Sequence, residues 1–159
     1  MKAGPREFMG RAVRSALAGI RRGDGGPFGA AIVREGRVIA VARNTVLRSQ
    51  DPTCHAEVKA IRAASRKLRR FDLSGCDIYS TTEPCPMCFA AIHWARIGRL
   101  VYGTRIGDVL RRGFNELSIP AARMKSLGKS CMRIEAGFMQ PECEKLLAEW
   151  DRLPHREVY

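Results

Sequence analysis

The sequence predicts an α/β domain built as a three-layer α/β/α sandwich around a mixed sheet of five strands. The chain has 159 residues, 45% of them hydrophobic, which is enough to bury the core of one domain. An amphipathic helix and a hairpin come first, and the later strands alternate with helices. Because hairpins join antiparallel strands and helical crossovers join parallel ones, the sheet is expected to be mixed.

The N-terminal part is expected to form a helix and the hairpin. Apolar residues recur at helical spacing and predict an amphipathic helix over residues 6–22, ending at Gly23. Two apolar runs, residues 30–33 and 38–41, flank a Glu-Gly pair at 35–36 and are typical of a β-hairpin. This segment therefore supplies the antiparallel part of the sheet.

The central part alternates between helices and strands. A turn signature at residues 51–53 precedes a predicted helix that runs from His55 to about residue 69. A strand at 77–81, a helix at 86–95 and a strand at 100–102 follow. These segments form the part of the chain in which strands are expected to run parallel.

Beyond Gly103 the periodicity is weaker. Residues 105–127 are expected to form loops with short helices, and residues 132–134 an edge strand. A last helix is indicated by the 3-4-3 spacing of Cys143, Leu146, Leu147 and Trp150. Residues 1–150 should thus form one domain, and the polar residues 151–159 a C-terminal tail.

The sequence shows neither a targeting segment nor a membrane segment. Residues 1–7 lack an apolar core of signal-peptide length, and no run of about 18 apolar residues occurs. A cytoplasmic protein without a membrane partner is expected. In a reducing compartment, the cysteines outside the metal motif described below are expected to be buried thiols: Cys54, Cys76, Cys131 and Cys143.

A formal net charge of +12 is the compositional feature that makes nucleic acid a candidate partner. The basic residues are scattered, however, with arginine pairs at 21–22, 69–70 and 111–112 and without a long cluster or interleaved aromatic residues. This distribution favours a solvated basic surface over an RNA-binding surface.

The most informative motif joins His55-Ala56-Glu57 to the run Pro84-Cys85-Pro86-Met87-Cys88. Pro86 is expected at the first position of a helix, where its missing N–H has no cost, and this places both cysteines on one face of the first turn. The positive end of the helix favours the thiolates that zinc requires. His55 should lie at a second helix start, so that two helix starts converge on one metal ion.

Three ligands and one free carboxylate indicate a catalytic zinc site rather than a structural one. A structural site has four protein ligands, whereas a catalytic site keeps one position open for water. His55, Cys85 and Cys88 are the predicted ligands of Zn²⁺, and Glu57 is the predicted general acid–base. The alternative is a structural zinc with Cys54 or Cys76 as fourth ligand.

With these motifs placed, the chain resembles the cytidine deaminase-like superfamily of zinc deaminases, and within it bacterial guanine deaminases and tRNA adenosine deaminases. The resemblance covers residues 24–104. It rests on Gly25-Gly26-Pro27-Phe28-Gly29-Ala30, Asn44, Asp51-Pro52-Thr53, His55-Ala56-Glu57-Val58, Glu83-Pro84-Cys85-Pro86-Met87-Cys88 and Ala91-Ile92-His93-Trp94-Ala95-Arg96.

The resemblance implies a hydrolytic deaminase of a purine base, with guanine favoured by Phe28, Trp94 and the terminal Tyr159. It also implies base contacts from the Asn44 amide and from the backbone N–H of Ala56. Guanine deaminases typically carry Gly-Phe-Asp-Asp where this chain has Gly-Phe-Asn-Glu at 113–116. Either Asn115 contacts the base and redirects specificity, or the neighbouring glutamate at 116 takes over.

Other substrates remain open alternatives. A tRNA-specific adenosine deaminase is the second reading, and another nucleoside, pyrimidine or triazine is a third. A non-catalytic zinc and RNA-binding protein is supported by the charge alone. Similar enzymes form homodimers in which the tail crosses to the partner and closes its site, so exchange of residues 151–159 is expected here. Glu83, beside the cysteine motif, is expected to hydrogen-bond the ligand shell.

Overall fold

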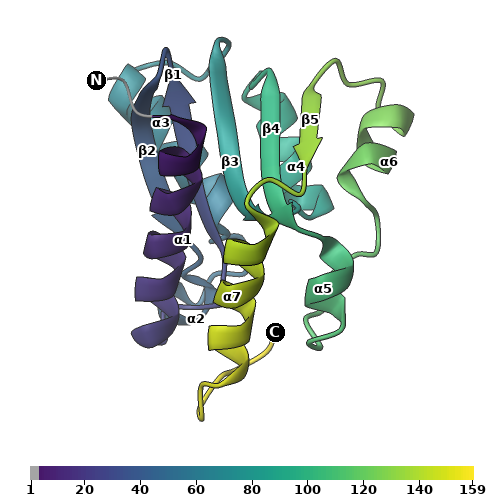
Figure 1. The fold of residues 1–159 in the computed structure, drawn as a ribbon. Coiled ribbons are helices and arrows are strands. Elements are labelled where there is room, and N and C mark those ends of the chain that lie inside the picture. Colours follow the sequence, from purple (N-terminus) through teal and green to yellow (C-terminus); the bar gives the residue numbers. More distant parts are fainter. Residues whose placement is uncertain (1–3) are drawn as a thin grey trace.

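The computed structural model describes residues 4–159 as a five-stranded sheet covered by helices on both faces (Figure 1). The strands lie in the order β2-β1-β3-β4-β5. They are, in chain order, β1 (Gly29–Arg34), β2 (Arg37–Arg43), β3 (Cys76–Thr82), β4 (Arg99–Thr104) and β5 (Arg133–Ala136). The predicted sandwich and its five strands are confirmed, although residues 1–3 of the predicted domain lie outside the described part.

Strand directions follow the connections. The hairpin pairs β1 with β2 in antiparallel fashion, and β1 also pairs antiparallel with β3. β3, β4 and β5 run parallel, since helices connect them. Consequently β2 and β5 are the two edges of the sheet.

Two helices cover one face of the sheet, and two others cover the opposite face (Figure 1). α1 (Pro5–Arg21) and α7 (Gln140–Asp151) lie together on the first face, whereas α3 (Ala56–Leu68) and α4 (Pro86–Trp94) pack on the second. Short helices occupy the connections: α2 (Val46–Ser49), α5 (Ile106–Leu110) and α6 (Ala121–Leu127).

Side chains of the central strands alternate between the two covered faces. In β3, Ile78 packs with the α3 and α4 side and Tyr79 with the α1 side; in β4, Leu100 and Val101 divide in the same way. Both faces are buried, which explains why these strands read as nearly continuous apolar runs.

The cysteine prediction is correct for three residues and wrong for the fourth. Cys54, Cys76 and Cys143 are buried, but Cys131 is exposed. Cys131 lies two residues before β5, in the loop that leads into this short edge strand, where no other strand pairs with it. Within residues 4–159, none of the helices is both long and apolar enough to cross a membrane.

Candidate metal and catalytic site

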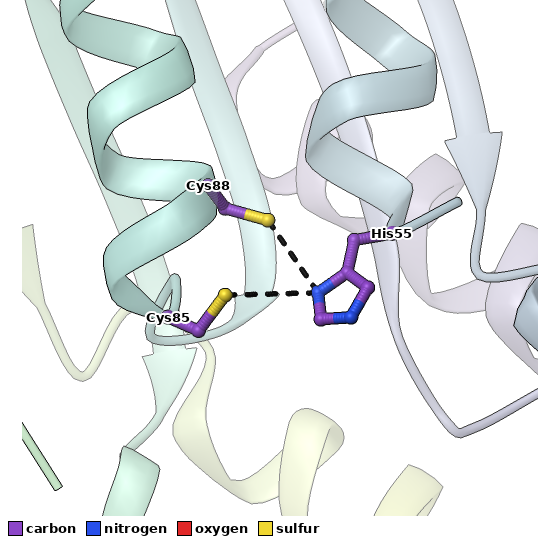
Figure 2. Close-up of side chains that lie close together, drawn as sticks. All are labelled: His55, Cys85 and Cys88. Carbon is purple, nitrogen blue, oxygen red and sulfur yellow. Dashed lines mark hydrogen bonds between the residues drawn. The ribbon is translucent and has the colours of Figure 1, made fainter. Parts of the chain in front are cut away.

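The starts of two helices bring the three predicted metal ligands together (Figure 2). His55 immediately precedes α3, and Cys85 immediately precedes α4 with Pro86 at the first helical position. Both residues have extended backbone angles, which turn the chain sharply into each helix. Cys88 lies one turn into α4, on the same side as Cys85.

The distances between these ligand atoms fit a tetrahedral zinc ion. His55 Nδ1 lies 3.7 Å from Cys85 Sγ and 3.5 Å from Cys88 Sγ. Bond lengths of about 2.3 Å to sulfur and 2.0 Å to nitrogen at a tetrahedral angle would separate nitrogen from sulfur by about 3.5 Å. A set of one imidazole and two thiols is also the donor chemistry that zinc prefers.

A fourth protein ligand is not part of this cluster. Among residues 4–159, the group of ligating atoms within reach of one another contains His55, Cys85 and Cys88 only. Cys54 points instead toward Asp51, with its sulfur 3.4 Å from Asp51 Oδ2. The arrangement agrees with an open catalytic site and disfavours the structural zinc with Cys54 as fourth ligand.

The two sulfur atoms differ in their readiness to lose a proton. A hydrogen bond from Cys88 holds the pKa of Cys85 well below its ordinary value, with the His55 imidazole acting in the same direction. The Cys88 thiol, which is buried and donates to that thiolate, has a raised pKa. Cys85 is thus the first thiolate of the pair.

Glu57 is buried in the first turn of α3, two residues beyond His55. Burial raises the pKa of its carboxyl group. Ser80 Oγ lies 2.8 Å from Glu57 Oε1 and 2.7 Å from the Thr82 carbonyl oxygen. Because a hydroxyl has one hydrogen, protonated Glu57 can donate to Ser80 Oγ while Ser80 donates to Thr82, so Ser80 can hold Glu57 in either state.

Sequence reasoning missed this supporting role of Ser80. Its only signal was a polar residue inside the buried strand β3, where Ile78 and Tyr79 precede it. Such a residue needs a buried partner. The identity of that partner depends on how α3 packs against the sheet, which the sequence pattern does not specify.

A cavity of about 340 Å³ opens beside the metal ligands. Its walls are mostly apolar. The residues that line it are Phe28, Val46, Pro52, His55, Cys85, Pro86, Met87, Phe114, Asn115, Glu116, Leu117 and Tyr159. Phe28 and Phe114 meet edge to face at 5.3 Å, and Tyr159 packs in the same way on Phe114 at 5.5 Å.

The terminal tyrosine closes one side of this cavity. Tyr159 Oη donates to Asn44 Oδ1 at 2.6 Å and accepts from the Gly26 N–H at 3.0 Å. Burial raises its pKa, so the hydroxyl remains a neutral donor. The Asn115 N–H donates to the Tyr159 carbonyl oxygen at 3.1 Å and fixes the end of the chain.

Within the single chain, the tail lies against its own subunit. All of these bonds are intramolecular, and Tyr159 reaches the cavity of the same chain. Exchange of the tail between subunits stays a prediction. The aromatic anchor is Phe114, which itself packs on Trp150 of α7 at 5.8 Å. These aromatic contacts hold the short tail against the helix from which it emerges.

Asn44 is buried and only partly satisfied. Its Oδ1 accepts from the Val46 N–H at 3.0 Å as well as from Tyr159. Its Nδ2, by contrast, has no hydrogen-bond partner among the described residues. Since the two bonds to Oδ1 fix the orientation of the amide, Nδ2 is a buried donor that needs an acceptor from outside the protein.

In the segment at 113–116, the side chain of Glu116 is more buried than that of Asn115. The Asn115 side chain is exposed at the rim, whereas that of Glu116 is partly buried. Burial raises the pKa of Glu116 to about 7, and the Cys85 thiolate acts in the same direction. Of the two alternatives that the sequence left open, the structure favours Glu116 as the residue nearer the metal ligands.

Trp94 is not a wall of this cavity in its own chain. It lies at the C-terminal end of α4 and is 80% exposed. Cys85 and Cys88 are at the opposite end of the same helix, so the side chain of Trp94, nine and six residues later, is carried away from them. Trp94 therefore does not line this cavity within a single chain, and its contribution to the site stays a prediction.

Glu83 also has a different role from the predicted one. Its carboxylate accepts from the N–H groups of Ile106 at 3.1 Å and Ala121 at 2.7 Å, at the starts of α5 and α6. These charge-assisted bonds satisfy donors that a helix leaves unpaired at its N-terminus. Glu83 thus ties two short helices to the cysteine turn and does not bond the ligand shell.

Comparisons with known proteins place this site in a recognised group. A family model described as "Cytidine and deoxycytidylate deaminase zinc-binding region" matches residues 4–104. Guanine deaminase from Bacillus subtilis (strain 168) is 47% identical over 109 residues, which cover 69% of this chain and 70% of that protein. The tRNA-specific adenosine deaminase from Agrobacterium fabrum (strain C58) is 46% identical over 147 residues, which cover 91% and 92%.

A solved structure shows the same relationship in three dimensions. A protein called NE0047, in complex with 2,6-diaminopurine, superposes with a TM-score of 0.87 at 32% sequence identity. The match covers 99% of this chain and 86% of that one. It therefore includes the sheet, both helix starts and the segment that carries Glu116.

Proposed function

This chain belongs to the cytidine and deoxycytidylate deaminase family and is a zinc-dependent hydrolytic deaminase, and we propose that it converts the free base guanine to xanthine and ammonia. The observation that carries the choice of a free base is the position of Tyr159. Its hydroxyl is bonded beside Asn44 and its ring covers one side of the aromatic cavity. A cavity with the terminal residue of the chain as one wall suits a small planar base better than a base attached to a polymer.

The zinc ligands in this proposal are His55, Cys85 and Cys88. Bound there, zinc would lower the pKa of water so that hydroxide is available at neutral pH. Glu57 would accept the proton of the attacking water and deliver it to N3 of guanine as the new C–O bond forms at C2. It would then take the remaining proton from the hydroxyl now on C2 and pass it to the amine, so that the C2 carbonyl forms, the C–N bond breaks and ammonia leaves.

Recognition of the base would use donors that the protein itself leaves unpaired. Asn44 Nδ2 is buried without a partner and requires an acceptor, such as a carbonyl oxygen or ring nitrogen of a purine. Ala56 is the first residue of α3, where a backbone N–H has no carbonyl in a preceding turn. Phe28 and Phe114 would supply apolar surfaces for the rings.

We propose that the carboxyl group of Glu116 binds the edge of the base that Asn44 and Ala56 do not contact. Guanine presents N–H donors on its amidine edge, and a carboxylate accepts such donors. Glu116 lines the cavity and is partly buried, while the Asn115 side chain is exposed. The replacement of Asp-Asp by Asn-Glu in this segment therefore moves the acceptor by one position and does not remove it.

The second candidate function is tRNA-specific adenosine deamination. It is favoured by the net charge of +12 and by the 46% sequence identity to the Agrobacterium fabrum enzyme over 91% of this chain. In that case a single-stranded loop base would enter the cavity. The structure of the tail opposes this reading, since Tyr159 would have to withdraw to admit a polynucleotide.

Ammonia release from zinc-loaded protein distinguishes the two functions. Guanine is expected to react faster than adenine, cytosine or their nucleosides, and the product should be xanthine. Inosine formation in an anticodon stem-loop is measured in parallel, with a Glu57→Gln variant as the control for contaminating activity. If the stem-loop reacts and guanine is inert, the substrate proposed here is wrong while the deaminase chemistry stands.

We expect the terminal tyrosine to contribute to base binding. Tyr159→Phe removes the hydroxyl that joins Asn44 to the Gly26 backbone, and KM for guanine should rise about tenfold because the Asn44 amide loses one of its two anchors. Deletion of residues 156–159 should have a larger effect on both KM and kcat. Zinc content should be unchanged in both variants.

The matched control for this prediction is Glu157→Ala, which changes an exposed residue of the same tail. Its kinetics should equal those of the unmodified enzyme. Unchanged kinetics of the truncated protein would remove Tyr159 from the site.

We infer that the enzyme acts as a homodimer that buries the C-terminal end of α4. Trp94 is 80% exposed and Phe71 is 73% exposed, and both line one groove of about 680 Å³. Exposed aromatic side chains in one patch are typical of protein interfaces. A second copy of the chain would cover them.

Sedimentation equilibrium tests this inference. The unmodified chain should sediment as a dimer and Trp94→Glu as a monomer. Leu127→Glu is the control, because Leu127 is 67% exposed but does not line this groove. A monomeric unmodified chain would contradict the inference.

A further inference from the structure

A basic cleft lies at the β2 edge of the sheet, away from the metal ligands. It has a volume of about 280 Å³ and is lined by Arg43, Arg48, Lys59 and Arg66, together with the hydroxyl-bearing residues Ser15 and Thr45. These residues come from α1, β2, α2, α3 and the segment after β2. Figure 1 shows α1 and α3 on the two sides of β2, at the edge of the sheet that supplies these residues. The fold thus gathers cations that are scattered in the sequence.

The cations of this cleft are poorly neutralised. Within residues 4–159, Asp24 is the one carboxylate at ion-pair distance from any of the four, at 2.7 Å from Arg43 and 3.8 Å from Arg48. Four positive groups therefore share one negative group. Such a cluster repels itself and attracts anions.

The side chain of Arg43 is held in place by Asp24 and Gly19. Asp24 accepts a hydrogen bond from Arg43 Nε at 2.7 Å, and its side chain is only 5% exposed. On the other side Arg43 passes over Gly19 of α1, where a Cβ atom would lie 2.5 Å from Arg43 Cδ. Glycine in a helix interior is unfavourable, so its presence here is explained by the space that Arg43 occupies. The terminal N–H groups of Arg43 make no hydrogen bond within residues 4–159 and remain available to a ligand.

Lys59 is positioned in a similar way. Its Nζ donates to Thr45 Oγ1 at 2.7 Å, and Thr45 Oγ1 lies 2.9 Å from Ser49 Oγ. Burial lowers the pKa of Lys59, and the charges of Arg43 and Arg48 add to this effect. The effect of the two arginines shows that positive charges in the cleft repel one another, and a bound anion would offset this repulsion.

We propose that this cleft binds a phosphate group, carried either by a small phosphate ester or by a nucleic-acid backbone. Guanidinium groups match phosphate oxygens with paired donors, while an ammonium group and hydroxyls supply single donors. All three donor types line the cleft. The site is separate from the catalytic cavity: within the segment after β2, Val46 lines the cavity whereas Thr45 and Arg48 line the cleft.

Calorimetric titration at low salt tests the proposal with probes that lack a base. Ribose 5-phosphate is compared with ribose, and a short labelled RNA is titrated in parallel by fluorescence anisotropy. At least one of the two phosphate probes should bind, ribose should not, and Arg48→Ala/Arg66→Ala should weaken that binding at least about tenfold. Both arginines are exposed and have no role in the deaminase site.

The control variant Arg123→Ala/Arg133→Ala removes the same charge from exposed positions on α6 and β5, at the other edge of the sheet. It should change affinity less than twofold. Binding of ribose 5-phosphate assigns the cleft to a small ester, whereas binding of RNA alone, with a salt dependence that is reduced in the Arg48/Arg66 variant, assigns it to a backbone. Absence of binding by both phosphate probes, or equal loss in the control, would overturn the proposal. Neither result depends on which base the enzyme deaminates.

Discussion

Glu57→Gln is expected to lower kcat for guanine at least about 100-fold while one zinc ion per chain remains bound. Glutamine retains the size of the side chain and a contact to Ser80, but it cannot accept the proton of the attacking water or return one to the base. Because Glu57 is buried, the neutral amide should not destabilise the fold. The loss should therefore appear in kcat with an unchanged melting temperature.

The measurements are steady-state kinetics, metal analysis and thermal unfolding on the same preparation. Ser80→Ala is the companion variant. It removes the hydroxyl 2.8 Å from Glu57 Oε1 without removing the carboxylate, so its kcat should lie between those of Glu57→Gln and the unmodified enzyme. Near-normal turnover of Glu57→Gln would exclude Glu57 as the proton carrier.

The second large effect is expected from Cys88→Ala, which removes one of the three metal ligands. Two remaining ligands should not hold zinc through dialysis, so metal content should fall far below one ion per chain and activity should be lost. The melting temperature should also fall, because an ion that binds only the folded chain stabilises it.

Cys76→Ala is the matched control for this experiment. Cys76 is as deeply buried as Cys88, but it lies in β3 outside the metal cluster. Its variant should keep its zinc and lose only the packing of a sulfur atom. Treatment of the unmodified enzyme with a chelator should lower its zinc content, activity and melting temperature to those of Cys88→Ala. Undiminished zinc in Cys88→Ala would show that the ligand set is different.

The cysteine motif specified its own geometry, since a proline at the first helical position and a three-residue spacing leave one local arrangement. The segment at 105–127 had no such determinants. Its two short helices are instead held by Glu83, whose carboxylate accepts hydrogen bonds from the backbone N–H groups of Ile106 and Ala121, more than 20 residues later in the chain.

A motif alone did not place two aromatic residues, Trp94 and Tyr159, in three dimensions. Trp94 lies within a motif shared with similar enzymes, yet α4 carries it to the end of the helix away from the ligands. Tyr159 is expected to reach the site of a partner, and in the single chain aromatic contacts to Phe114 hold it beside its own cavity. In both cases the decisive information was the direction of a helix or a tail, which a short pattern does not contain.

The sequence by itself determined the fold class and the cluster of residues that could hold a metal ion, and it predicted the acid–base group, because these depend on local periodicity, helix starts and the chemistry of a few side chains. Only the tertiary structure decided which polar groups face one another across elements. It left Asn44 Nδ2 without a partner, set Ser80 beside Glu57, and gathered four cations at the β2 edge. Such contacts depend on how α1, α3 and the tail pack against the sheet, and packing is set by the whole chain at once.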